Sequence, residues 1–482
     1  MDALICRIES PLLSSPLLFA SPFDILIVNM RIICLIFVLA VGILCPVLSA
    51  VVSNEVGQAH WDLSTSLNGF SFERAKAFTV KTIDRPGIHV SRLKNLKGKV
   101  DSHPRSSLSL LSRSQNSGPG ESAAHYQNIS ALGRFSTAYG IQCSWDNTPV
   151  WFIFDTGSSD TWAAKTGFRC EDGAGRTHDQ ASCNFGQPHI PNFLQDVSGV
   201  YFHRRYGSGE DVSGPMGTSD IACGGISVSG QQVGLASRAY WRGDNVTVGI
   251  LGLAYPSLTS GYLGDPADPV DDSDWNNYPY TPWLTNAIAQ GLIDPVFSVS
   301  IGRNSSNGVL AWGGLPPMPW DPKAFAATDL IIAKLVDRDT TAWEPSFYTI
   351  IPDGLQWGST TDTGKYPYIV DTGTTMMHVP SPLADAIARS FIPPATYMPQ
   401  WGAYFADCHA IPPRFAVIIS GIRFWINPAD LIYQEFTDPT GKCAIAISTG
   451  GPGPYILGDV FLQNVVAAFD VGGAEMRFYS KQ

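Results

Sequence analysis

Charged side chains are scarce in this 482-residue chain, at 15% of all residues. Basic residues are the rarer kind, because 31 Lys and Arg stand against 42 Asp and Glu and leave a net charge of −11. This balance argues against nucleic acid as a partner, since phosphate binding needs an excess of cations. Gly and Pro are abundant by contrast, at 46 and 35. They favour a turn-rich β protein, and the length predicts more than one domain.

The sequence also lacks CxxC pairs and His-rich clusters, so we expect neither a metal nor a cofactor. It has one long apolar run, residues 32–44, which follows Met30-Arg31 and precedes small residues up to Ala50. This order is typical of a secretory signal peptide over residues 30–50, which would make residues 1–29 an over-extended gene model. The run is too short for a comfortable membrane span. An uncleaved internal anchor is the alternative. The polar residues 477–482 carry no lipid-anchor signal, so we expect no stable membrane anchor.

Basic residues are concentrated after this apolar run. Residues 71–115 hold ten Lys and Arg against three Asp and Glu, whereas residues 116–482 hold nineteen against thirty-four. A basic leader before an acidic body predicts a pro-segment over residues 51–120 that electrostatic attraction holds in place. The alternative is a solvated linker with random charge. Residues 106–122 are rich in Ser, Gly and Pro and read as an exposed, cleavable linker.

One sequence motif occurs twice in the rest of the chain. Phe152-Ile-Phe-Asp155-Thr156-Gly157-Ser158 is matched by Tyr368-Ile-Val-Asp371-Thr372-Gly373-Thr374. Each copy predicts a buried strand that delivers a carboxylate to a tight turn. Gly249-Ile-Leu-Gly252 and Ile456-Leu-Gly458 follow the two acids at similar spacing. The repeat predicts two homologous lobes, residues 121–305 and 306–482, each contributing one carboxylate to a shared cleft.

These motifs, together with Tyr206-Gly-Ser-Gly209, resemble the pepsin-like aspartic proteases and fall in that family's order. Secreted fungal members are the most similar. The resemblance implies a mostly all-β, bilobal pepsin-like fold with an active-site cleft between the lobes and a few short helices. It also implies a mechanism. Two close carboxylates share one proton, so the ionised partner activates a water while the protonated partner donates to the carbonyl oxygen.

The resemblance also assigns roles to individual residues. Asp155 and Asp371 would be the catalytic acids, with Gly157 and Gly373 leaving room for backbone N–H groups. The other implied roles are hydrogen bonds to the outer carboxylate oxygens (Ser158, Thr374), bonds across the lobe interface (Thr156, Thr372), a flap that closes over the substrate (Tyr206, Gly207, Ser208, Gly209) and support of the flap tyrosine (Trp162). Simple turn capping is the alternative for the threonines. A pro-segment lysine often pairs with the acids in this family, and here Lys94 or Lys97 would do so.

Glu210 and Asp211 depart from the usual flap sequence. They either disfavour acidic substrate side chains near the scissile bond or form a solvated edge, and the second reading is favoured. The insertion at residues 259–282 predicts a long surface loop over one end of the cleft. Short helices are expected over residues 283–291, which end on Gly, and 382–391, where Pro382 suits the first turn.

Six of the nine cysteines lie in the predicted mature body, and an even number there favours disulfides. Cys6, Cys34 and Cys45 fall in the leader. Cys170 and Cys183 are expected to close a loop of the first lobe. Cys408 and Cys443 match the position of a bridge in related enzymes, and Cys143 and Cys223 are left for each other by elimination. Three Asn residues begin glycosylation sequons, which predicts surface loops in the secretory route: Asn128, Asn245 and Asn304.

The sequence therefore predicts a secreted, monomeric aspartic endopeptidase that is made as a zymogen and cleaves extended polypeptides at acidic pH. A vacuolar location is the alternative. The rival function is a catalytically inactive pepsin-like binding or inhibitor protein, but such proteins usually lose one of the motifs that are intact here. A glycoside hydrolase with paired carboxylates explains neither the duplicated Asp-Thr-Gly nor the flap.

Overall fold

Strands dominate the chain. A computed structural model describes residues 70–74, 125–132, 138–265, 276–302, 308–316, 320–335, 345–451, 453 and 455–481. In these ranges the α-helices are short: α3 (Trp283–Ala289), α4 (Ser381–Arg389) and α5 (Asp459–Leu462). The 3-10 turns are η1 (Gln180–Cys183), η2 (Pro256–Leu258) and η4 (Pro428–Leu431). The prediction of a mostly β protein with a few short helices is confirmed.

The first predicted lobe forms one wing of a 15-stranded sheet. Buried and less buried residues alternate along its strands. In Thr148–Asp155 the residues that face the core are Val150, Phe152 and Phe154. Burying each large apolar side chain contributes roughly 1.5–3 kcal/mol. The strands of this wing are β3 (Ala138–Trp145), β4 (Thr148–Asp155), β5 (Thr161–Glu171), β6 (Thr177–His178), β7 (Gln195–Arg205), β8 (Asp211–Cys223), β9 (Ile226–Tyr240), β10 (Gly249–Gly252) and β11 (Gly261–Leu263).

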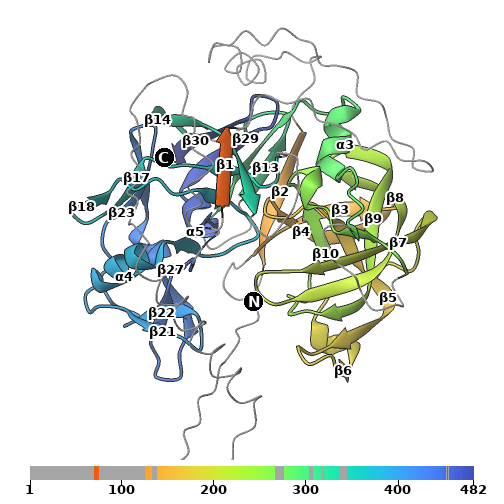
Figure 1. Cartoon of the computed structure of the whole chain (residues 1–482), viewed down its shortest axis with the longest axis horizontal. Helices are drawn as coiled ribbons and strands as arrows, with labels where there is room; N and C mark the ends of the chain where they lie inside the picture. The colour runs from red at the N-terminus through yellow and green to blue at the C-terminus, as the bar shows by residue number, and fades with distance from the viewer. Residues whose placement is uncertain are drawn as a thin grey trace, which may run out of the picture. The chain divides into compact units, whose positions relative to one another are not determined.

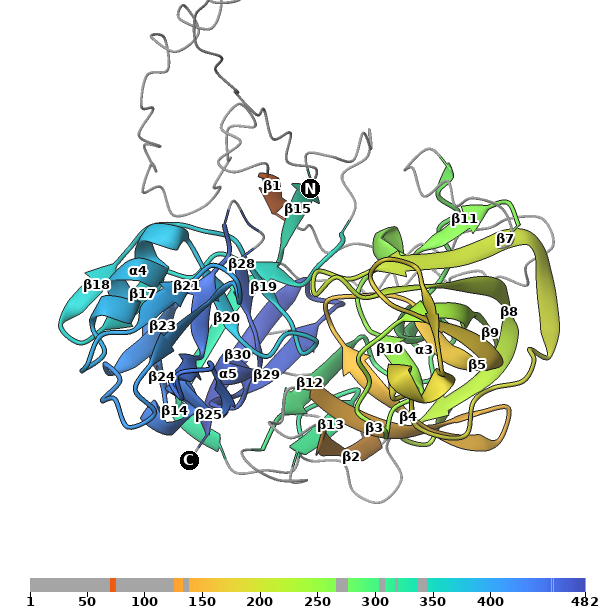
Figure 2. The ribbon, with the colours of Figure 1, turned by 90° about the horizontal axis from the view of Figure 1, so that it is seen from below.

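The same sheet continues from the first predicted lobe into the second. From β3 it passes in order through β2 (His125–Leu132), β13 (Gly308–Trp312), β12 (Val296–Ser300), β29 (Val465–Asp470), β30 (Glu475–Lys481) and β14 (Trp320–Asp329). Figure 1 shows β2 and β13, and Figure 2 shows them together with β12, between the other strands of the two predicted lobes. The predicted boundary at residues 305 and 306 falls in the loop from β12 to β13, outside the described residues.

Three smaller sheets are built from strands of the second predicted lobe, and the first of them also includes β1 (Phe70–Arg74) of the predicted pro-segment. This seven-stranded sheet has the order β1, β15 (Ile331–Leu335), β16 (Thr349–Ile350), β19 (Tyr368–Val370), β28 (Tyr455–Leu457), β20 (Met377–Val379) and β27 (Ile447–Thr449). One four-stranded sheet has the order β18 (Thr360–Asp362), β17 (Gly354–Trp357), β23 (Phe415–Ile419) and β24 (Ile422–Ile426). The other has the order β21 (Thr396–Met398), β22 (Ala403–Ala406), β26 (Cys443–Ile445) and β25 (Ile432–Thr437).

A single large core joins the two predicted lobes. Phe297 of β12 stacks on Phe469 of β29 with ring centroids 4.5 Å apart, and Tyr348 packs edge-on against Phe469 at 4.8 Å. Helix α3 closes one side of this core, where Trp283 packs on Trp312 and donates its indole N–H to the Ile221 carbonyl. Close packing of this kind restricts relative motion of the two lobes.

The predicted helices are close to those observed. Helix α3 ends at Ala289, and Gly291 follows with φ +70°. Helix α4 begins at Ser381 and ends at Arg389, two residues before the predicted end. The insertion at residues 259–282 differs from the expected surface loop. Its described ends are largely buried, and β11 within it pairs with β7.

Candidate active site

Asp155 and Asp371 occupy equivalent places on two pairs of parallel strands. Asp155 is the last residue of β4, which pairs with β10, and Asp371 directly follows β19, which pairs with β28. The repeated Ile-Leu-Gly segments supply the partner strands: Ile250 lies opposite Ile153, and Ile456 lies opposite Ile369. The duplication in the sequence is therefore a duplication of backbone geometry.

Each carboxylate accepts the same two hydrogen bonds from its own turn. Asp155 Oδ1 accepts the Gly157 N–H at 2.7 Å, and its Oδ2 accepts the Ser158 hydroxyl at 2.5 Å. Asp371 Oδ1 accepts the Gly373 N–H at 2.8 Å, and its Oδ2 accepts the Thr374 hydroxyl at 2.7 Å. These bonds orient both carboxyl groups and stabilise a negative charge on them.

Thr156 and Thr372 connect the two turns. The Thr156 N–H donates to Thr372 Oγ1 at 3.1 Å, and the Thr372 N–H donates to Thr156 Oγ1 at 3.0 Å. Each hydroxyl then donates to a carbonyl of the opposite strand, Thr156 to Val370 and Thr372 to Phe154. Both threonines are fully buried. Turn capping alone does not describe these bonds, because each one crosses between segments more than two hundred residues apart.

The two glycines bring each turn against the opposite carboxyl group. A Cβ atom built on Gly157 would lie 2.5 Å from Asp371 Oδ1, and one built on Gly373 would lie 2.4 Å from Asp155 Oδ1. Only a residue without a side chain fits at these two positions without displacing the acids. The carboxyl groups of Asp155 and Asp371 thus share one small space.

Burial and the nearby charge of Asp155 make Asp371 a weaker acid than an exposed carboxyl group. The two residues are only 6% and 8% exposed. Burial first, and then the negative charge of Asp155, raise the pKa of Asp371 to about 7, although the bonds from Thr374 and Gly373 act in the opposite direction. A pair that keeps one proton across the acid range has a base and an acid side by side.

Tyr206 begins the turn between β7 and β8. Its N–H donates to the Glu210 carbonyl, and the Gly209 N–H returns to the Tyr206 carbonyl, with Gly209 at φ +91°. Gly207 and Ser208 are exposed at the tip. The Tyr206 hydroxyl accepts the Trp162 indole N–H at 2.8 Å. The Trp162 ring packs against the rings of Trp241, Phe185 and Phe202.

Glu210 and Asp211 have partners on the flap itself. Asp211 accepts from Arg205 Nε at 3.0 Å and lies 3.1 Å from His203 Nε2, and these contacts lower its pKa despite partial burial. Glu210 accepts the Ser208 hydroxyl at 2.7 Å. Of the two readings left open for these acids, a charged edge tied to its own hairpin agrees better with these contacts than a pair of free acids facing the cleft.

Two buried acids near the site were not singled out by the sequence. Asp160, five residues after Asp155, accepts the Ser260 N–H at 2.8 Å and the Tyr280 hydroxyl at 2.7 Å. Asp459 is fully buried, and within the described ranges neither of its oxygens has a hydrogen-bond partner. Burial, followed by the charges of Asp371 and Asp155, raises the pKa of Asp459 well above its usual range. Both acids adjoin the repeated motifs, which was the available signal.

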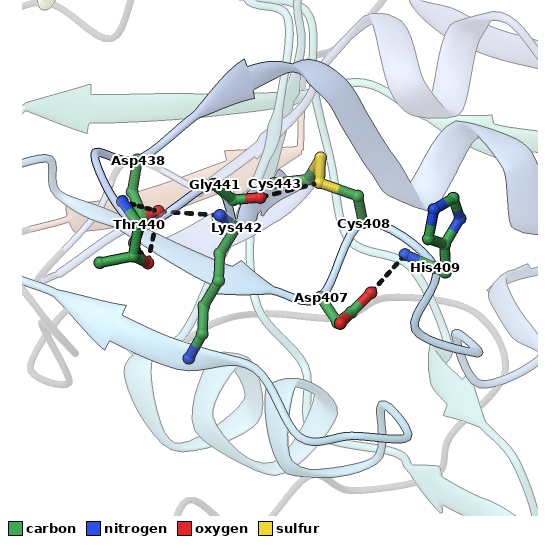
Figure 3. The surroundings of a disulfide bond; sticks show 8 residues. All are labelled: Asp407, Cys408, His409, Asp438, Thr440, Gly441, Lys442 and Cys443. Carbon is green, nitrogen blue, oxygen red and sulfur yellow. Dashed lines mark hydrogen bonds between the residues drawn. A yellow bond between two sulfur atoms is a disulfide. The ribbon is translucent and has the colours of Figure 1, made fainter.

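The described part of the chain holds three disulfides, with the three pairings expected: Cys143–Cys223, Cys170–Cys183 and Cys408–Cys443. The first joins the directly paired strands β3 and β8. Figure 3 shows the third, which ties the turn at Asp407–His409 to the first residue of β26. In the loop before β26, Asp438 accepts the Thr440 and Lys442 N–H groups.

The sequons differ in their surroundings. Asn245 is exposed with φ +62° in a loop. Asn128 lies within β2, between β3 and β13, so the expectation of a surface loop is wrong there. Asn304 lies outside the described residues, as do Lys94, Lys97, the cysteines Cys6, Cys34 and Cys45, and the predicted signal segment. Over the described part of the chain, no helix is long and apolar enough to cross a membrane.

Comparisons with known proteins agree with this geometry. A family model described as eukaryotic aspartyl protease matches residues 147–480. A probable aspartic-type endopeptidase of Aspergillus fumigatus is 39% identical over 342 residues, which are 68% of this chain and 74% of the relative. The acid protease of Saccharomycopsis fibuligera is 26% identical and covers 67% of this chain and 75% of its own.

A solved structure shares the fold. The aspartic proteinase from Irpex lacteus superposes with a TM-score of 0.55 over 75% of this chain and 98% of that protein, at 19% identity. This likeness concerns the fold alone, and it confirms the predicted pepsin-like architecture. The family match over residues 147–480 and the 39% identity show that the chain is related to these proteases by common descent. The chain belongs to the eukaryotic aspartyl protease family and is an aspartic-type endopeptidase.

Proposed function

We propose that Asp155 and Asp371 form the catalytic dyad of this endopeptidase and that it works at acidic pH. The observation that carries the proposal is the reciprocal approach of each glycine to the opposite carboxyl group. It brings together two acids that lie 216 residues apart along the chain. A water held between them would lose a proton to the ionised carboxylate while it attacks the peptide carbonyl. The protonated partner would donate to the carbonyl oxygen and so stabilise the tetrahedral intermediate.

Substrate binding would use the flap and the main chain of the peptide. An extended peptide would lie between the dyad and the hairpin tip at Tyr206–Gly209, which closes over it and excludes water. The bond from Trp162 to Tyr206 supports this role, because it holds the tyrosine ring in one orientation. Peptide bonds between large apolar residues are the expected targets.

We further propose that the enzyme is made as a secreted, monomeric zymogen with residues 51–120 as its pro-segment. Strand β1 supports this part, because Phe70–Arg74 pairs antiparallel with β15 in the sheet that also holds β19, directly before Asp371. A segment paired in this way is held close to the acidic body by backbone bonds as well as by charge. The disulfides and the sequon at Asn245 suit the secretory route. Delivery to a vacuole is the alternative.

Acid activation of the protein expressed from Met30 tests the proposal. The protein is shifted from neutral pH to about 3.5–4 with an unfolded protein substrate, and both substrate cleavage and the mass of the chain are followed. Asp155→Asn and Asp371→Asn are expected to abolish cleavage. Asp353→Asn, at a half-exposed acid that pairs with Lys365, should cleave like the wild type. Loss of roughly the pro-segment from the wild type alone supports the zymogen. Intact substrate from a folded body without its pro-segment would overturn the dyad.

A further inference from the structure

The strand that leads into the flap presents different residues on its two faces. Side chains alternate along a strand, so Phe202, Arg204 and Tyr206 share one face. Phe202 is fully buried with its ring centroid 6.2 Å from that of Trp162, and Tyr206 bonds to the same indole. The other face carries His203 and Arg205, which both contact Asp211. Arg204 is therefore the charged residue of the inner face of the flap strand.

The Arg204 guanidinium lies beside the ring of the flap tyrosine. Its Cζ atom is 5.6 Å from the centroid of the Tyr206 ring. No hydrogen bond or ion pair joins it to any residue within the described ranges, and its Nε is buried without an acceptor. Buried arginine N–H groups are nearly always bonded, because leaving them unpaired costs free energy. An acceptor for this group is thus missing from the described residues.

Asp160 is the acid whose charge interacts with Arg204, but no hydrogen bond or ion pair joins the two side chains, and Asp160 Oδ2 is buried without a donor in the described part of the chain. Its Oδ1 accepts from Ser260 and from Tyr280. Burial raises the pKa of Asp160, and the positive charge of Arg204 offsets this only in part. In the acid range a carboxyl group shifted in this direction tends to be neutral, so it leaves the Arg204 charge uncompensated.

The two phenols near Arg204 and Asp160 do not supply an anion. Burial raises the pKa of Tyr206 and Tyr280 well above their ordinary value, so both phenols are neutral. In the function proposed above, the Tyr206 hairpin closes over the substrate. The Arg204 guanidinium lies 5.6 Å from the centroid of the Tyr206 ring, so it would adjoin a peptide bound in this way.

We propose that Arg204 is a specificity-determining residue that binds the carboxylate of an acidic substrate side chain beneath the flap. The proposal rests on the function proposed above. A guanidinium offers two parallel N–H donors to a carboxylate, and such bonds are strong where water is excluded. The occupant would be an Asp or Glu of the substrate at one fixed position relative to the scissile bond, in addition to apolar residues at that bond.

A set of fluorogenic peptides tests this directly. Each peptide has the same apolar residues at the scissile bond, and Glu replaces Gln at one position at a time on either side. At pH about 5 most of the substrate Glu is ionised. We expect wild-type kcat/KM to favour Glu over Gln about tenfold at one position, in line with one charge-assisted hydrogen bond. At pH about 3.5 this ratio should fall towards one, since the substrate carboxylate becomes protonated.

Substitutions of Arg204 and of its neighbour Arg205 test which arginine causes the preference for Glu over Gln. Arg204→Met should bring the Glu/Gln ratio to about one, and Arg204→Lys should retain part of it. Arg205→Met is the matched control, because Arg205 is the next residue, carries the same charge and points outward with a 73% exposed side chain. It should keep the wild-type ratio.

The outcomes separate this inference from the proposed function. Cleavage of the peptides with equal rates for Glu and Gln at every position overturns the role of Arg204 and leaves the dyad standing. A preference that survives in Arg204→Met also overturns it. Failure of the wild type to cleave any peptide at acidic pH would instead count against the proposed function. The wild-type ratio is informative even if Arg204→Met does not fold.

Discussion

The hydroxyl of Thr372 accepts the N–H of Thr156 at 3.1 Å, and the hydroxyl of Thr156 accepts the N–H of Thr372 at 3.0 Å. Thr372→Val should break both bonds made by its hydroxyl and leave the Thr156 N–H and the Phe154 carbonyl unpaired. We expect a loss of about 1–3 kcal/mol in the free energy of unfolding for each unpaired group, together with lower kcat. Urea unfolding and steady-state kinetics measure both effects.

Thr161 offers a matched control for this substitution. It is buried like Thr372, but its hydroxyl has no hydrogen-bond partner in the described part of the chain. Thr161→Val should therefore be neutral or slightly stabilising. Equal stability of the two valine variants would contradict a bonding role for Thr372.

Gly157→Ala should damage activity more than stability. The new Cβ would lie within 2.5–2.7 Å of three atoms of the Asp371 carboxyl group. That carboxyl group or the turn must move, and a displacement of about 1 Å in a reacting group costs roughly a hundredfold in rate. The control is Gly173→Ala, where the nearest atom, Tyr240 Cε1, is 3.6 Å away. If Gly157→Ala keeps wild-type kcat, the two turns are not as close as described.

Asp459 should make the protein less stable as the pH rises. Its pKa is raised in the folded state, so between its ordinary and its raised pKa the native protein holds a proton that the unfolded chain releases. Its contribution to stability is therefore fully present below about pH 4 and is lost as the pH rises, at up to about 1.4 kcal/mol per unit. Asp459→Asn removes this loss and should flatten the decline in urea midpoint from pH about 4 to about 6.5.

Two controls accompany the Asp459 measurement. Asp353→Asn, at a 44% exposed side chain, should leave the decline unchanged. Intact mass after each incubation excludes self-cleavage as the cause. A decline in Asp459→Asn as steep as in the wild type would show that Asp459 is not held protonated.

The disulfides should differ in their contribution to stability according to the loop they close. Cys143–Cys223 spans 80 residues and Cys170–Cys183 spans 13. The chain-entropy model gives about 4.5 kcal/mol for the first and about 3 kcal/mol for the second. Paired Cys→Ala variants measured by urea unfolding should follow this order. The reverse order would indicate that native packing around Cys170 and Cys183, rather than loop closure, dominates.

Much of the fold was predictable from local sequence. The apolar runs before Asp155 and Asp371, and the Ile-Leu-Gly segments after them, predict buried strands. Their apolar side chains are most stable when they are packed away from water. Helices α3 and α4 were predictable because the apolar spacing and the terminal residues that specify a helix act over only a few positions of the chain. The bonds of Ser158 and Thr374 to their own acids span three residues, so the motif itself contains that geometry.

Other features depended on segments that are distant in sequence. Asn128 lies in a strand because β3 and β13 flank it, although its sequon alone suggested a loop. The insertion at residues 259–282 sends Tyr280 into the interior to meet Asp160. No sequence pattern distinguishes Arg204 from other arginines. Only the folded structure surrounds it with described residues that offer its guanidinium no acceptor.

The sequence by itself determined that two Asp-Thr-Gly turns end two buried strands in a family of aspartic proteases. Tertiary structure decided that Gly157 touches Asp371 and Gly373 touches Asp155, and that Asp459 is fully buried. The physical reason is that strand formation depends on neighbours along the chain. Desolvation and charge repulsion, which set the pKa of a carboxyl group, depend on atoms that only packing brings together.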